Sequence, residues 1–165
     1  MHRAARSCLL ITTREMLASL KRLFADSIAD ETLHAREFEQ LAVAVAGLVQ
    51  EMMRVDLHVK PGETQAAEAA LAQILALPAG EARALLDRAS GHRFTSYFGP
   101  VSIMKRMLSL EQRAHLVEML WRIAFSDDAL DPYEDHFVRK IAHLLYVPNT
   151  DTMLARQRAR VAVKP

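Results

Sequence analysis

The sequence predicts an all-α protein, a compact bundle of about seven helices. Apolar residues recur at helical spacing along most of the chain. No segment alternates apolar and polar residues between turn signals, as a half-buried strand would. Several segments also begin with residues that typically cap helices. These three observations agree, so we expect helices throughout and no sheet.

The composition indicates one globular domain. The chain has 165 residues, 51% of them hydrophobic, which is enough for one core. Its formal charge of +1 gives no global field that would recruit nucleic acid, so we expect no nucleic-acid partner. The single cysteine, Cys8, excludes an intrachain disulfide and favours a cytoplasmic location. The longest uncharged apolar run, Leu41–Val49, is about half of the roughly 20 residues that a membrane helix needs, so we expect no integral membrane segment.

The first elements lead to a central helix. Residues 1–15 are expected to be a disordered extension, or to precede the true start codon, because Met16 opens a better amphipathic segment. Their apolar stretch is too short for a signal peptide. Residues 16–165 then form the single helical domain. Met16–Phe24 places four apolar side chains on one face and predicts a helix that docks on the core or lies on a membrane surface. Ala35–Val55 is apolar on every side in its middle, which is typical of an enclosed helix.

Three shorter elements follow in the middle of the chain. A helix over Pro61–Ala76 is expected, because proline is favoured at a first helical position. Pro78–Gly80 separates it from a short helix over Glu81–Ala89. Phe94–Leu108 contains Gly99-Pro100 and is therefore either a bent helix or a turn followed by a helix.

The next helix has the clearest start signal. Ser109 and Gln112 have the spacing of a capping box. Its solvent face is expected to carry a polar stripe made of Glu111, His115, Glu118 and Arg122. Trp121, in the middle of the same helix, is interpreted as a core residue or a subunit contact.

Two helices complete the bundle. Asp131, Pro132 and Glu134 have the pattern of a cap, a first-turn proline and a third-position acid, and they start a helix that runs to Tyr146. A weaker helix follows over residues 150–165, and its arginines suit a helix C-terminus.

An internal repeat relates the two halves of the chain. A single offset of 71 residues places Asp56 on Asp127, Pro61 on Pro132 and Glu63 on Glu134. The same offset pairs apolar positions on either side of these residues. The chain therefore contains two similar helix–acidic loop–helix units that we expect to pack their apolar faces together.

The acidic loops are the candidate cation sites. The second loop and the helix start after it, residues 126–135, hold five carboxylates in ten residues, and such oxygens are the ligands that Ca²⁺, Mg²⁺ and Mn²⁺ prefer. The candidate ligands are Asp127, Asp128, Asp131 and Glu134 in the second loop and Asp56 and Glu63 in the first. The first loop is the weaker site, because Lys60 stands where the second loop has Asp131.

Helix capping offers a competing interpretation of the same residues. Asp131 and Glu134 are what an ordinary N-cap and capping box contain. Asp127 and Asp128 lie where a helix ends, and negative charge there opposes the helix dipole. A cation, a basic side chain or water at an exposed turn would offset that repulsion.

Catalytic patterns are missing from the sequence. His136 and His143 lie two helical turns apart, roughly 10 Å, which is too far to chelate one ion. No phosphate-binding glycine loop is present, and no nucleophile has a neighbouring base in the sequence. We therefore expect a protein that is not an enzyme, with a metal-dependent hydrolase as the remaining enzymatic reading.

Val117–Tyr146, with its WRIAFSDDALDPYED phrase, resembles the second half of TerB-like domains from the tellurite-resistance family. LVQEMMRVDLHVKPGE upstream resembles the first copy of the same motif, and HRFTS resembles the phrase between them. The resemblance implies a helical bundle with pseudo-twofold halves, as at the start of a membrane-anchored J-domain co-chaperone, and a link to stress resistance. It also implies a metal role for the acidic positions. The sequence departs from the family pattern at Leu57 and Asp128, where the family usually has glycine after the first aspartate.

Two functions follow as expectations. The first is a non-enzymatic stress-response scaffold that binds a divalent cation through its acidic loops. The second is a protein–protein interaction module without metal, whose acidic loops are only helix caps. In either case we expect a cytoplasmic protein with an unidentified protein partner or a second copy of itself in a homodimer.

Overall fold

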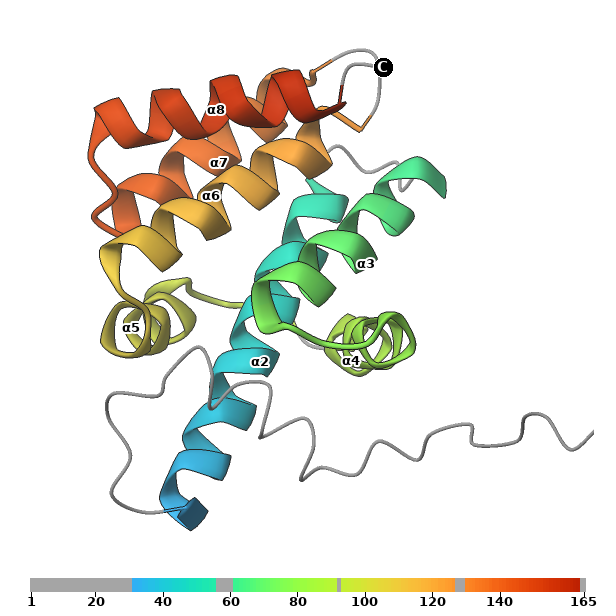
Figure 1. Cartoon of the computed structure of the whole chain (residues 1–165), viewed down its shortest axis with the longest axis vertical. Coiled ribbons are helices and arrows are strands. Elements are labelled where there is room, and N and C mark those ends of the chain that lie inside the picture. Colours follow the sequence, from blue (N-terminus) through green and yellow to red (C-terminus); the bar gives the residue numbers. More distant parts are fainter. Residues whose placement is uncertain (1–30, 56–60, 92, 127–129, 164–165) are drawn as a thin grey trace, which may run out of the picture.

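Seven helices form the part of the chain that the structure, a computed structural model, describes: residues 31–55, 61–91, 93–126 and 130–163. They are α2 (Glu31–Arg54), α3 (Pro61–Leu75), α4 (Ala79–Ser90), α5 (Phe98–Met107), α6 (Leu110–Ala124), α7 (Pro132–Leu144) and α8 (Asn149–Val163), shown in Figure 1. These ranges contain no strand. The predicted all-α bundle is confirmed.

Most predicted helix boundaries agree with the structure to within a few residues. α2 begins four residues before the predicted start at Ala35. Phe94–Leu108, for which the sequence left two alternatives, is a turn followed by a helix. Pro100 lies in the first turn of α5, where a backbone N–H has no partner within the helix, so its missing N–H costs no hydrogen bond. The predicted extension (residues 1–15) and the predicted helix over Met16–Phe24 lie outside the described residues.

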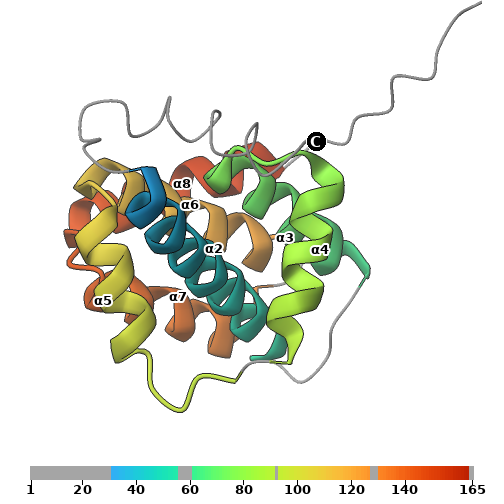
Figure 2. The same ribbon diagram turned by 90° about the horizontal axis from the view of Figure 1, so that it is seen from below.

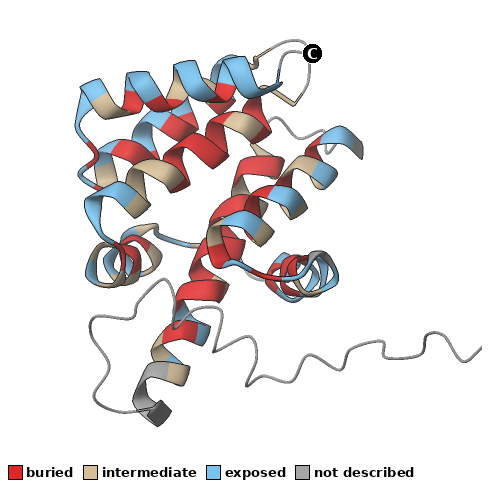
Figure 3. Cartoon of the chain, viewed as in Figure 1, coloured by how far each residue is buried: buried red, intermediate tan, exposed pale blue. Residues whose placement is uncertain are grey.

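The central helix α2 runs through the middle of the bundle. It packs against α3 and α4 on one side and against α5 and α6 on another. α7 and α8 pack on α6 (Figure 1), and the view from below shows α2 between α5 and α4 (Figure 2). Nearly every residue of Leu41–Val49 is buried, whereas α8 is exposed along its outer face (Figure 3). The enclosed helix that the sequence predicts is therefore α2.

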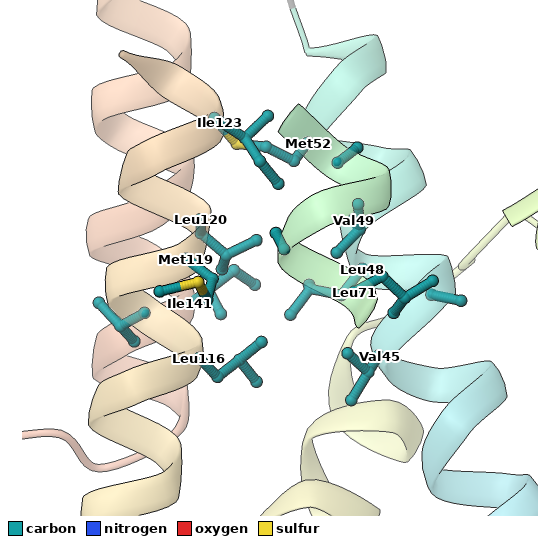
Figure 4. Close-up of a cluster of buried hydrophobic side chains, with 14 of the residues drawn as sticks. Val45, Leu48, Val49, Met52, Leu71, Leu116, Met119, Leu120, Ile123 and Ile141 are labelled. Carbon is teal, nitrogen blue, oxygen red and sulfur yellow. The ribbon is translucent and has the colours of Figure 1, made fainter. Parts of the chain in front are cut away.

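The core is centred on the contact between α2, α3 and α6. Leu116, Leu120 and Ile123 of α6 face α2 and α3 across an interface filled with aliphatic side chains (Figure 4). Each fully buried leucine or isoleucine contributes about 1.5–3 kcal/mol relative to an exposed one. Trp121 is also fully buried in the chain, so the interpretation as a core residue is confirmed.

The repeat comprises three helices in each unit. α2, α3 and α4 correspond to α6, α7 and α8, and the third helix of each unit packs on the first. Both units end their second helix with the same hydrogen bond, from Leu77 N–H to the Ala72 carbonyl and from Val147 N–H to the Ala142 carbonyl. This six-residue closure is a Schellman turn. The two acidic loops are therefore part of a larger duplicated unit, and α5 connects the copies.

Both Schellman turns place a residue other than glycine in the left-handed region. Ala76 has φ 51° and Tyr146 has φ 56°. A proline follows two residues later in each unit, and its carbonyl accepts the first hydrogen bond of the third helix, from Ala82 in α4 and from Thr152 in α8. From this turn onward the units correspond at an offset of 70 residues, one fewer than at the loops.

Truncation of the central interface should destabilise the fold strongly. Leu120→Ala removes a fully buried side chain between the two units and should lower the free energy of unfolding by about 2–5 kcal/mol in urea denaturation. Val161→Ala, at a 70% exposed position on α8, is the control and should change it by less than about 0.5 kcal/mol. Equal effects of the two substitutions would contradict this assignment of the core.

Candidate functional site

The second acidic loop ends in a complete capping box. Asp131 is the N-cap of α7, and its Oδ1 accepts a hydrogen bond from the Tyr133 backbone N–H at 2.7 Å. Glu134 reaches back, and its Oε2 accepts from the Asp131 N–H at 3.1 Å. These bonds satisfy donors that the first turn of a helix leaves without partners. The capping role predicted for both residues is confirmed.

The third residue of the helix after each acidic loop is a buried glutamate. Glu134 of α7 is 6% exposed, and Glu63, at the equivalent position of α3, is 2% exposed. Burying a carboxylate costs free energy unless its oxygens are hydrogen-bonded. Glu134 meets this condition through the Asp131 N–H. The two glutamates that the 71-residue offset aligns in the sequence are therefore also buried to a similar extent in the structure.

The candidate cation ligands are divided between described and undescribed positions. Asp131, Glu134 and Glu63 are described, whereas Asp56, Asp127 and Asp128 lie outside the described residues. Within the described ranges, no three carboxylate, imidazole or thiol side chains come together to hold a metal ion. The cation hypothesis therefore depends on the loop positions that follow Ser126 and Val55.

An arginine links the remaining acid of this region to the end of α6. Asp135 forms ion pairs with Arg139 at 2.6 Å and with Arg156 of α8 at 3.3 Å. The Arg156 guanidinium lies 5.2 Å from the centroid of the Trp121 ring, which stacks on Phe125. Cation–π contacts of this kind contribute about 0.5–2 kcal/mol. The helix end that leads into the second loop is therefore supported by α7 and α8.

Several buried polar atoms have no hydrogen-bond partner among the described residues, and they include the Trp121 Nε1 and the Ser126 Oγ near the end of α6. A buried polar group without a partner is uncommon in native proteins. A hydroxyl oxygen can ligate a hard cation, whereas an indole N–H cannot. Ser126 is thus an additional candidate ligand that the sequence analysis did not include.

Glu118 does not lie in the solvent-facing stripe that the sequence predicts. It is 5% exposed, because α8 covers this part of α6. Its Oε1 accepts from Arg122 at 2.8 Å and its Oε2 accepts from Arg158 of α8 at 2.7 Å. The periodicity of α6 could not reveal this, because the covering helix comes 40 residues later in the chain.

The pKa of Glu118 reflects two opposing effects. Burial of the carboxylate raises its pKa. Hydrogen bonds and charge attraction from Arg158 and Arg122 lower the pKa by more than burial raises it, so the pKa lies below its ordinary value. The charged form is therefore stabilised in the folded protein. Glu118 acts as a structural link between α6 and α8.

A family model described as tellurite resistance protein TerB matches residues 40–157, more than two thirds of the chain. The chain belongs to the TerB family. The matched region begins within α2 and ends within α8, so it includes both units and both acidic loops of this TerB-family chain. No curated protein and no solved structure matches significantly. Among the described residues, no single helix is long and apolar enough to cross a membrane, although the bent pair α3 and α4 passes by length and composition.

Neutralising Glu118 should reduce the loss of unfolding free energy that acidification causes. At pH 7, Glu118→Gln should lower the free energy of unfolding by about 1–3 kcal/mol, since it weakens two charge-assisted hydrogen bonds. The folded pKa lies below the ordinary 4.5, so the contribution is present above pH 4.5 and is lost as the pH falls through the folded value.

Urea denaturation of wild type and Glu118→Gln at pH 7 and at pH 3 checks this. The difference between the two proteins should shrink at the lower pH. Glu39→Gln, which removes an exposed pair with Arg88, is the control and should change stability by about 1 kcal/mol or less. A difference for Glu118→Gln that is equally large at both pH values would contradict the assigned charge state.

Proposed function

We propose that this TerB-family chain is a non-enzymatic cytoplasmic scaffold in the response to tellurite or other metal stress, and that it holds a divalent cation at its second acidic loop. The observation that carries the proposal is the environment of Glu134. This carboxylate is buried in the first turn of α7, which follows the acidic loop in the sequence, and its Oε2 accepts a hydrogen bond from the Asp131 N–H.

The non-enzymatic part rests on the structural use of the polar groups in the second unit. Glu118 bonds to Arg122 and Arg158, and Asp135 bonds to Arg139 and Arg156. A general base needs a carboxylate that can exchange a proton with substrate, and one held between two arginines is a poor base. These groups support a role in fixing the bundle rather than in chemistry.

The cation part rests on oxygen-bearing side chains that lie close together in the sequence, between Ser126 and Asp131. Asp131 uses one carboxylate oxygen, Oδ1, for its cap. Ser126, which precedes the loop in the sequence, has a buried hydroxyl with no hydrogen-bond partner among the described residues. Asp127 and Asp128 lie between them in the sequence. Ca²⁺, Mg²⁺ and Mn²⁺ take mixed carboxylate and hydroxyl or water ligands of this kind.

The second candidate function is a protein-interaction module without metal. The complete capping box of α7 favours it, because this geometry explains Asp131 and Glu134 without an ion. In that case the acidic loops would only terminate and start helices. The two candidates differ in whether the loop residues that are not caps bind a cation.

Calorimetric titration with Ca²⁺, Mg²⁺ and Mn²⁺ distinguishes the two candidates. Wild type should bind one of these ions, and its melting temperature should rise with ion concentration, since an ion present at 100 times its Kd adds about 2.7 kcal/mol of stability. Asp127→Asn with Asp128→Asn should abolish both effects. Asp87→Asn, at a 67% exposed carboxylate on α4, should leave them unchanged.

Two further measurements separate ion binding from loss of the cap. Glu134→Gln keeps a side chain that can complete a capping box but removes its charge, so it should weaken ion binding more than it lowers the melting temperature of the ion-free protein. The fluorescence of Trp121, the single tryptophan, should respond to the ion because Trp121 stacks on Phe125 beside the loop. If no ion produces heat, a melting shift or a fluorescence change, the cation proposal fails and the interaction module stands.

A further inference from the structure

One end of the bundle carries a groove with an apolar floor and an acidic rim. α5 ends, α6 begins, α7 ends and α8 begins at this end (Figure 1). The groove has a volume of about 400 Å³ and is lined by Leu110, Glu111, Ala114, Asp151, Leu154 and Arg158. Leu110 is 43% exposed and Leu154 is 51% exposed, so both offer apolar surface that the described part of the chain leaves uncovered.

The acidic rim of this groove is not neutralised by any residue that the structure describes. Arg158 lines the groove, but its guanidinium is bonded to Glu118. Glu111 and Asp151 form no ion pair with any residue that the structure describes. The groove is therefore suited to an apolar side chain that carries a positive charge beside it.

A basic aromatic knob lies beside the groove at the same end. It consists of Tyr146, which is 70% exposed, and Lys105, whose Nζ lies 4.1 Å from the centroid of the tyrosine ring. Lys105 has no ion-pair partner among the described residues. The knob therefore presents an aromatic surface and an uncompensated ammonium group together.

The fold does not require a tyrosine at position 146. Its backbone is left-handed, a conformation that costs a residue other than glycine about 1 kcal/mol or more. The equivalent turn of the first unit is made by Ala76, which has no comparable side chain. The large ring of Tyr146 thus contributes little to the turn, and strained residues with exposed side chains often serve binding.

Sequence and packing hold the knob next to the groove. Leu110 of the groove is five residues after Lys105 of the knob, and Asp151 is five residues after Tyr146. Arg113 of α6 donates a hydrogen bond from Nη1 to the Leu145 carbonyl at 2.5 Å, which ties the knob's turn to the helix that forms one wall of the groove. A surface that carries both a knob and a complementary groove can pair with a copy of itself, as a twofold interface requires.

We propose that two copies of this chain associate through this end about a twofold axis, with the Tyr146–Lys105 knob of each copy seated in the groove of the other. The tyrosine ring covers Leu110 and Leu154, and the Lys105 ammonium faces Glu111 and Asp151. Each contact occurs twice because of the symmetry. Charge complementarity favours a second copy over nucleic acid, whose phosphates would be repelled by the rim.

Charge reversal tests the interface through mixing. Wild type should sediment as a reversible dimer with a Kd of about 100 µM or tighter in analytical ultracentrifugation. Lys105→Glu alone, and Glu111→Lys with Asp151→Lys, should each weaken the dimer about tenfold or more, since each places like charges together at two symmetric contacts. An equimolar mixture of these two variants should restore a dimer, because both of its contacts then join opposite charges.

Matched controls separate the interface from folding. Arg160→Glu reverses a charge on α8 outside the knob and the 400 Å³ groove and should leave the dimer intact. Thermal melting followed by circular dichroism should show that all variants remain folded. A monomeric wild type at 100 µM, or a dimer that the single variants leave unchanged, would overturn the proposal. A mixture that stays monomeric while wild type dimerises would also overturn the pairing of knob with groove.

Discussion

The bundle depends on the burial of the middle of α2, Leu41–Val49, on all of its sides. A helix whose middle is Ala, Val and Leu has no polar face to turn toward water, so it is stable only when neighbours enclose it. α3, α4, α5 and α6 supply that enclosure. Both units contribute to this enclosure, because α6, the first helix of the second unit, packs on α2, the first helix of the first unit.

The two units have the same architecture but differ in the side chains that cover equivalent positions of their first helices. In the second unit, Thr152, Ala155 and Ala159 are buried on α8, and Glu118 bridges to Arg158. In the first unit, the position that corresponds to Glu118 is Gly47, and an added Cβ there would lie 2.4 Å from the Phe94 ring. Gly47 therefore makes room for an aromatic side chain where the second unit has a charged link. Duplication preserved the shape of the unit while its chemistry diverged.

The same divergence concerns the surfaces that serve binding. The second unit has the acid-rich loop, the arginine-supported end of α6 and the exposed Tyr146, whereas the first unit has Lys60 in its loop and Ala76 at its turn. The groove at the start of α6 and α8 also belongs to the second unit. The cation and the second copy are therefore proposed at opposite ends of α7, and binding at one end leaves the other accessible. In this view the first unit mainly completes the core.

The sequence by itself determined the elements of this protein. Local signals sufficed for the capping boxes at Ser109 and Asp131, for the enclosed α2 and for the offset that aligns Glu63 with Glu134, because each depends on residues a few positions apart or on a regular pattern. Tertiary structure alone decided that Glu118 is buried, that the Arg156 guanidinium lies over Trp121 and that Arg113 of α6 bonds to the Leu145 carbonyl. These features join segments 30 or more residues apart, and no local pattern specifies which helix will cover another.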